Sequence, residues 1–151
     1  MNFKDFLYVY SIGAIGYSFV EIVWRGYTHW TMGILGGICF TIMYLIDGKF
    51  STSNIYFRAF VSACCVTIAE LVTGIIVNKY LHMHVWDYSQ MKFNFLGQVS
   101  LVYSIFWFFL CIPCHLLCKI LRHRIFGVLS QSSRHLTKIF ERQPTLRQKE
   151  Q

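Results

Sequence analysis

Four long apolar segments follow one another along the chain, and few charged residues interrupt them. They cover approximately residues 6–26, 31–46, 56–81 and 97–119. A helix needs about 20 mainly apolar residues to cross the hydrocarbon core of a bilayer. The pattern therefore predicts an all-α integral membrane protein, with a bundle of four transmembrane helices in residues 1–120. The second segment is short, and its small Gly33 and Gly37 would let another helix approach closely.

Small and polar residues recur within three of these segments at steps of three or four. Such a spacing places them on one face of a helix. Because lipid cannot satisfy a polar side chain, we expect these faces to meet at the centre of the bundle. The faces consist of Ser11, Ala14, Ser18, Glu21 and Arg25 in the first segment, of Ala59, Ala63, Thr67, Glu70 and Gly74 in the third, and of Ser100, Ser104, Trp107, Cys111, Cys114 and Cys118 in the fourth.

The chain becomes basic after the fourth apolar segment. Eight of its fourteen Lys and Arg residues lie from Lys119 onward. Between residues 121 and 142, apolar residues lie roughly on one side of a helical pattern and basic residues surround the other. This pattern predicts an interfacial amphipathic helix at 121–142 that binds anionic lipid. The last residues, 143–151, are expected to form a disordered tail.

The positive charges also predict the orientation in the cell membrane. With four spans, both termini lie on one side, which would carry eleven Lys and Arg residues against three on the other. Cytoplasmic loops carry the excess of positive charge. We therefore expect the N- and C-termini to be cytoplasmic, and the loops at 27–30 and 82–96 to face outward.

Composition narrows the class of protein. Hydrophobic residues make up 55% of the chain and charged residues 14%, whereas soluble domains carry about 25% charged residues. The net charge of +7 is concentrated at the C-terminal end, which favours lipid and not nucleic acid as its partner. The six cysteines lie inside apolar segments and are interpreted as packing residues. No nucleotide-binding motif, metal site, cofactor site or catalytic constellation is visible, so an enzyme is not predicted.

Glu21 and Glu70 are the first candidate functional residues. A charged side chain inside a span costs about 2.5–3.5 kcal/mol on insertion scales, so it is normally paired, protonated or facing water. One hypothesis is an outward-open pocket for a small cation, a proton or a cationic solute. The other is a structural clamp, in which Arg25, one helical turn after Glu21, pairs with one or both carboxylates. The remaining polar residues of this predicted pocket or clamp are Thr67, Thr73 and Ser104.

The loop residues Trp86, Asp87, Tyr88 and Ser89 are the second candidates. Trp and Tyr are typical of membrane interfaces, because one part of each ring system is apolar and another forms hydrogen bonds. Asp87 is well placed to accept hydrogen bonds from the backbone of a turn. The loop is either a plug that closes the outer end of the bundle or an outer lid that contacts a ligand.

Several short pieces occur in an order and at a spacing typical of one family. The pieces are Gly16-Tyr17 with Glu21, Glu70-Leu71-Val72-Thr73-Gly74, Trp86-Asp87-Tyr88-Ser89, Phe93-Asn94-Phe95, Gly97, and Tyr103-Ser104 with Trp107. Over residues 10–110 the chain resembles the ABC-transporter type IV (CmpB-like) family, including its small four-pass vertebrate transmembrane relatives. The resemblance implies a small multi-pass membrane protein of the permease type.

Two functions follow as hypotheses. The first is a small permease or channel-like protein that forms a homo-oligomer, because four helices alone enclose only a narrow pore. The second is a non-transporting adaptor or assembly subunit, which packs on a membrane partner protein and uses the Glu and Arg residues as a clamp.

Overall fold

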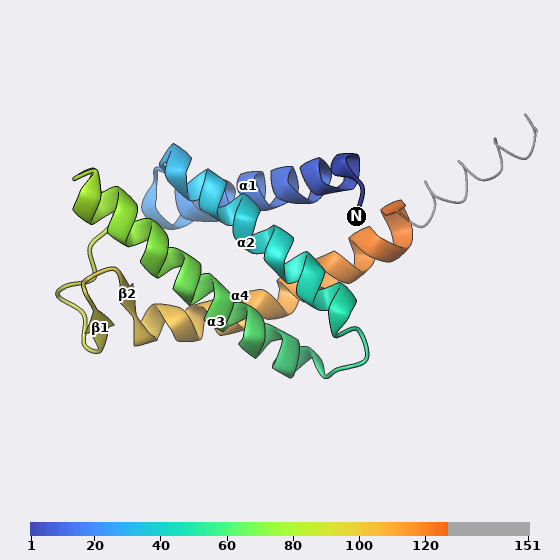
Figure 1. The fold of residues 1–151 in the computed structure, drawn as a ribbon. Coiled ribbons are helices and arrows are strands. Elements are labelled where there is room, and N and C mark those ends of the chain that lie inside the picture. Colours follow the sequence, from blue (N-terminus) through green and yellow to red (C-terminus); the bar gives the residue numbers. More distant parts are fainter. Residues whose placement is uncertain (127–151) are drawn as a thin grey trace, which may run out of the picture. The chain divides into compact units, whose positions relative to one another are not determined.

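A computed structural model describes residues 1–126 of the chain and shows four long helices (Figure 1). The helices are α1 (Phe3–Arg25), α2 (Trp30–Lys49), α3 (Ile55–Gly74) and α4 (Leu101–Ile120). The π-helical segment η1 (Ile75–Tyr80) continues α3. By length and composition, all four helices can cross a membrane. The predicted all-α architecture with four membrane-spanning helices is confirmed.

Helix α2 lies at the centre of the packing and touches α1 through glycines. A Cβ atom on Gly36 would lie 2.3 Å from Cβ of Tyr17 in α1, and one on Gly13 of α1 would lie 2.4 Å from Cβ of Phe40. Gly37, one residue of the predicted close pair, lies against the ring of Tyr10. Glycine is required at these positions because any larger side chain would force α1 and α2 apart.

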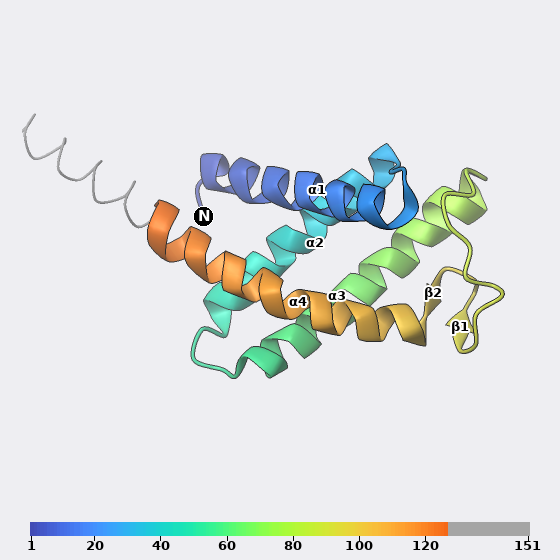
Figure 2. The same cartoon turned by 180° about the vertical axis from the view of Figure 1, so that it is seen from behind.

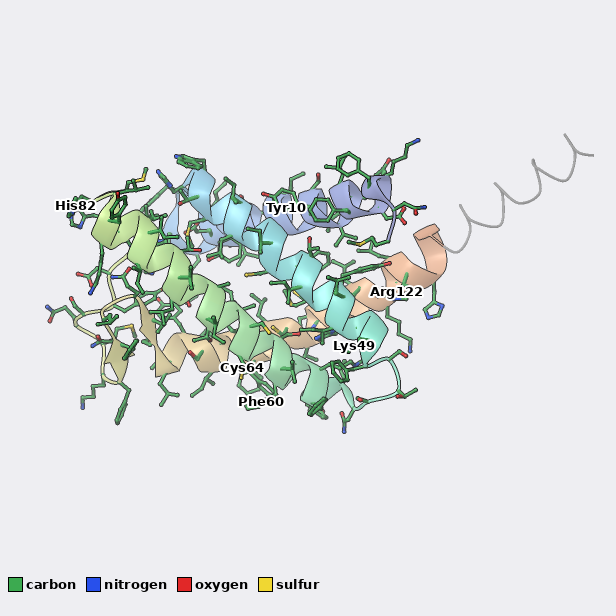
Figure 3. The ribbon with its side chains drawn as sticks, viewed as in Figure 1. Tyr10, Lys49, Phe60, Cys64, His82 and Arg122 are labelled. Atoms are coloured by element: carbon green, nitrogen blue, oxygen red, sulfur yellow. The ribbon has the colours of Figure 1, made fainter. Side chains whose placement is uncertain are left out.

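Helix α2 is longer than the sequence pattern predicts. It continues through Asp47 and Gly48 to Lys49, beyond residue 46, where the predicted segment ends. Asp47 is buried and bound by Arg58 of α3, so the last turn of α2 packs against α3 and remains helical. Figure 3 shows Lys49 at the end of α2 and His82 just beyond η1, at opposite ends of this helix pair. We call these the Lys49 end and the loop end.

Helix α4 begins four residues later than the predicted span. Leu96 and Gly97 both have positive φ angles, which a helix cannot contain. The short strands β1 (Asn94–Phe95) and β2 (Val99–Ser100) then pair in antiparallel register, with Asn94 opposite Ser100 (Figure 1). The loop between η1 and α4 is therefore an ordered cap, which ends in a small hairpin.

The packing described below concerns the compact unit formed by residues 1–116. Of the predicted amphipathic helix at 121–142, the structure describes the helical segment η2 (Leu121–Phe126). The rest of that helix and the predicted tail at 143–151 lie outside the described residues.

Candidate functional site

Both carboxylate oxygens of Glu21 accept hydrogen bonds at the end of α1. Arg25 Nη1 donates to Oε1 over 3.0 Å, and Thr28 Oγ1 donates to Oε2 over 2.5 Å. The side chain is buried, and Arg25 is half-buried. Arg25 also reaches the loop, because its Nη2 donates to the carbonyl oxygen of Val85 over 2.9 Å. Glu21 and Arg25 thus connect α1 to the residue that precedes Trp86.

Glu70 forms an equivalent connection from α3. Tyr88 Oη donates to its Oε1 over 3.1 Å, and Trp107 Nε1 donates to its Oε2 over 2.9 Å. Only 2% of Glu70 is exposed. Burial and the neighbouring Glu70 carboxylate raise the pKa of Tyr88, so the phenol keeps the proton that it donates. One buried carboxylate therefore joins α3, the loop and α4.

A third set of hydrogen bonds fixes the loop to η1. Asn78 Nδ2 donates to the carbonyl oxygen of Trp86 over 2.9 Å and to Gln98 Oε1 over 2.8 Å, while its Oδ1 accepts from Val85 N over 2.7 Å. Trp86 Nε1 donates to the carbonyl oxygen of Gln98 over 2.9 Å. Gly74 leaves the space for this arrangement, because a Cβ atom there would lie 2.6 Å from Gln98 Oε1. The buried polar side chains of Asn78, Trp86 and Gln98 thus all form hydrogen bonds, as is usual for buried polar groups.

Asp87 and Ser89 form an exposed turn in the same loop. Asp87 accepts a hydrogen bond from Ser89 N over 2.8 Å and one from Ser89 Oγ over 3.0 Å. These bonds lower the pKa of Asp87, because they stabilise its ionised form. The predicted turn at Asp87 has this geometry, and its carboxylate is a fixed negative charge at the surface of the loop.

A cavity of about 540 Å³ lies beside the loop, between α1 and α4. This volume is within the range of about 300–1,000 Å³ that is usual for ligand pockets. Glu21, Arg25 and Asp87 supply its charged groups. The Tyr88 and Trp107 rings that hold Glu70 also line the cavity, whereas Glu70 itself lies behind them. Figure 2 shows the course of helices α1 and α4, which supply most of the lining residues, from the side opposite to Figure 1.

Aromatic rings bridge the two helices that border the cavity. The ring centres of Tyr17 in α1 and Trp107 in α4 are 5.8 Å apart, and those of Trp24 and Phe106 are 6.0 Å apart. Aromatic pairs at these separations attract each other. The cavity therefore has a wall of rings on both sides and charged groups beside the loop.

The predicted site residues divide into three groups. Glu21 and Arg25 lie in the cavity wall, and Glu70 lies behind it. Thr67 and Ser104 form a hydrogen bond of 3.2 Å between α3 and α4, and none of Thr67, Thr73 and Ser104 is among the cavity residues. Arg25 pairs with Glu21, and the hydrogen-bond donors to Glu70 in the described chain are the neutral Tyr88 and Trp107.

Sequence reasoning missed the contribution of Trp107 to this site. Its helical spacing from Ser104 and Cys111 was visible, since all three belong to the polar face of the fourth segment. A tryptophan on a face that otherwise consists of small and polar residues was the available signal. The aromatic cavity wall gave no signal, because aromatic residues make up 18% of the chain and most of them suit lipid contact.

A second buried polar cluster at the Lys49 end was also missed. Asp47 of α2 binds Arg58 of α3 and lies 3.5 Å from Nδ1 of His115 in α4. His115 Nε2 lies 3.0 Å from Ser62 Oγ. His115 and Ser62 are almost fully buried. A histidine inside the apolar fourth segment was the available signal, together with an aspartate at the end of the second.

The fold and this site define an integral membrane protein with four spanning helices and a capped cavity at one end. A family model described as "Putative ABC-transporter type IV" matches residues 5–142. The chain belongs to this family, as the sequence pieces around Glu70 and Trp86 predict. It is therefore a multi-pass membrane protein of a transporter-type family. No solved structure matches the chain.

Proposed function

We propose that this chain is a small permease that binds a cationic solute in the cavity beside the Trp86–Ser89 loop. In this proposal, Glu21 and Glu70 hold the loop in the position that completes the cavity wall, so that weakening either connection impairs solute binding. One observation carries the proposal: the same loop that borders the cavity is bound directly to Glu70 and, through Arg25, to Glu21. Arg25, which is paired with Glu21, binds Val85, and Glu70 binds Tyr88.

The two carboxylates have different roles in this proposal. Glu21 lies in the cavity wall, so its charge contributes directly to the potential that a solute meets. Glu70 lies behind Tyr88 and Trp107 and acts on the solute through them. Both oxygens of Glu70 accept hydrogen bonds, one from Tyr88 and one from Trp107, whereas an amide of the same shape has only one accepting oxygen. Glu70→Gln therefore loses one of the two bonds that hold the loop in this position.

The test is flux through the purified protein in lipid vesicles. The panel contains rubidium ions, protons followed with a pH-sensitive dye, and small organic cations. We expect saturable uptake of at least one cation by the wild type. We expect Glu70→Gln to reduce this uptake at least tenfold while the protein still inserts into the vesicles. Asp5→Asn preserves an oxygen acceptor for Asn2 N in the first turn of α1 and lies outside the cavity lining, so it is the matched control and should retain full uptake.

Two results would contradict this function. The first is the absence of flux for every cation of the panel in the wild type. The second is a Glu70→Gln variant that transports as fast as the wild type. A Glu70→Gln variant that fails to accumulate would instead favour the clamp.

One specific observation favours the second candidate, a non-transporting adaptor or assembly subunit. Each of the four carboxylate oxygens of Glu21 and Glu70 accepts a hydrogen bond from this chain, as a purely structural clamp requires. Crosslinking followed by mass measurement separates the candidates. A permease of this size should be recovered as a homo-oligomer, whereas an adaptor should be recovered with a different membrane protein in fixed stoichiometry.

A further inference from the structure

Half of the residues that line the cavity are aromatic. They come from α1, from the loop and from α4, so the rings surround the space from three sides. The aromatic residues are Tyr17, Phe19, Trp24, Trp86, Tyr88, Tyr103, Phe106 and Trp107. The face of an aromatic ring carries partial negative charge and attracts cations. Rings on three sides suit a weakly hydrated cation, because such a cation does not require water or carboxylate oxygens on every side.

The charged residues that line the cavity also favour a cation. Glu21 and Arg25 form an ion pair, so their charges largely cancel. Asp87 remains, and its hydrogen-bond donors in the described chain are the neutral groups of Ser89. The cavity wall therefore carries a net negative charge beside its rings. An anionic ligand would meet repulsion from Asp87 and from the ring faces.

The apolar wall of the cavity is accessible to the lipid. Phe19, Val23, Trp24 and Phe106 line the cavity, and their exposed fractions are 66%, 72%, 68% and 57%. They lie on membrane-spanning helices, so these surfaces face hydrocarbon. A ligand can therefore place a charged group beside Asp87 and an apolar group between α1 and α4, without moving that apolar group into water.

We propose that the cavity binds an organic ammonium ion that carries an apolar substituent, with the ammonium group among the rings near Asp87. This inference rests on the proposed function, because it names the substrate class of the same cavity. The ammonium group belongs either to a free lipophilic amine or quaternary ammonium solute, or to the headgroup of a choline lipid. Both sources share the chemistry that the cavity recognises.

Binding to the full-length protein in maltoside micelles tests the inference. The probe is benzyltrimethylammonium, and the control ligand is neopentylbenzene, which has the same shape without the charge. Cation–π attraction is strongest at desolvated sites, where it corresponds to about a tenfold or larger change in Kd. We expect the charged probe to bind at least about tenfold more tightly than its neutral isostere.

Two substitutions locate the binding in this cavity. Asp87→Asn preserves an acceptor for Ser89 N and removes the charge, and Phe106→Leu removes a ring whose exposed position tolerates the change. Each should weaken binding of benzyltrimethylammonium several-fold. Phe109→Leu, on the same helix with a similarly exposed ring outside the cavity lining, and Asp5→Asn are the matched controls and should bind like the wild type.

Competition identifies the source of the ammonium group. Displacement of the probe by dihexanoylphosphatidylcholine, but not by dihexanoylphosphatidylglycerol, assigns the site to a choline lipid headgroup. Displacement by tetrabutylammonium alone assigns it to a free solute. Either result supports the inference.

The failures of the inference and of the proposed function are distinguishable. Equal affinity for the charged and neutral probes would overturn ammonium recognition and leave a solute-binding cavity. Absence of probe binding with continued flux of rubidium ions or protons would overturn the inference and leave the permease. Absence of binding and of all flux would overturn both.

Discussion

Two buried polar clusters lie at opposite ends of the helix bundle, and they differ in what surrounds them. At the loop end, Glu21 borders a cavity of about 540 Å³, and Glu70 lies one ring behind it. At the Lys49 end, Asp47, Arg58 and His115 are packed between three helices, and none of them is among the residues that line that cavity. Burial of charge is common to both clusters. The cluster at the loop end borders the cavity, and for this reason we propose that it is the functional one.

The arrangement at the Lys49 end shows why a constellation of residue types is not enough. Ser62, His115 and Asp47 follow one another through contacts of 3.0 and 3.5 Å, which is the order of a hydrolytic triad. Ser62 is fully buried, however, and Arg58 binds the same carboxylate. A nucleophile needs space for a substrate beside it. The cluster is better explained as a connection between α2, α3 and α4.

The largest expected effect comes from breaking that connection. Asp47→Ala leaves the positive charge of Arg58 buried without this partner, and removing one member of a buried ion pair costs about 3–5 kcal/mol. We expect a loss of this size in the free energy of unfolding, measured by circular dichroism during denaturation in mixed micelles. The protein that remains folded should bind benzyltrimethylammonium normally. Loss of ligand binding by the folded fraction would show that the two ends are coupled.

The next largest effect is expected from a glycine substitution at the place where the loop packs on α3. Gly74→Ala places a methyl group 2.6 Å from Gln98 Oε1 and should displace the loop. Overpacking of this kind costs about 1–3 kcal/mol. We expect faster hydrogen exchange in the loop and weaker binding of the ammonium probe. Gly16→Ala is the control, because nothing lies within 4 Å of its added methyl group. Equal behaviour of the two variants would contradict the close packing of the loop on α3.

Much of the fold could be predicted from the sequence because hydrophobicity repeats along whole helices. Four spans and the polar face that carries Glu70 follow from that repetition. The end of α2 was misplaced because Asp47 and Gly48 usually favour a turn, whereas here Arg58 binds Asp47 from another helix. The delayed start of α4 depends on positive φ angles at Leu96 and Gly97, and Leu96 gives no signal of such an angle in the sequence because a leucine rarely adopts it.

The candidate site was predictable only in its carboxylates and its loop. Glu21, Glu70 and Trp86–Ser89 depart visibly from their apolar surroundings. Their partners could not be assigned, because the choice of Trp107 and Tyr88 as donors to Glu70 depends on how helices from distant parts of the chain face each other. Equally, an aromatic residue that faces a cavity cannot be distinguished by type from one that faces lipid.

Removing one hydroxyl group from the loop should have a smaller effect. Tyr88→Phe deletes the hydrogen bond to Glu70, and such bonds within membrane proteins contribute about 0.6 kcal/mol on average. We expect a loss of this order in the free energy of unfolding and a measurable increase in the rate of probe dissociation. Tyr80→Phe, at an exposed position near the same loop, is the control. A change of equal size in both variants would rule out a special role for the Tyr88 hydroxyl.

The smallest expected effect concerns the pH dependence of ligand binding. The unperturbed pKa of aspartate is about 3.9, and the hydrogen bonds from Ser89 lower the pKa of Asp87. A lowered pKa means that the charge is present above the unperturbed value and is lost only as the pH falls through the lower one. The contribution of the Asp87 charge to binding of benzyltrimethylammonium should thus be constant from neutral pH down to that range. Ser89→Ala removes one of these bonds, so its binding curve should decline at a higher pH than that of the wild type. Identical pH dependence of binding in the wild type and in Ser89→Ala would contradict a role of the Asp87 charge in binding.

The most direct test of the difference between the two ends is to locate a bound ammonium ion. We propose a structure of the protein with 4-iodobenzyltrimethylammonium, in which the anomalous scattering of iodine marks the ligand. We expect a single strong iodine peak between α1 and α4, with the iodobenzyl group near the rings of Trp24 and Phe106 and the ammonium group beside Asp87. An iodine peak at the Lys49 end, or none in the cavity at a concentration that saturates binding, would contradict it.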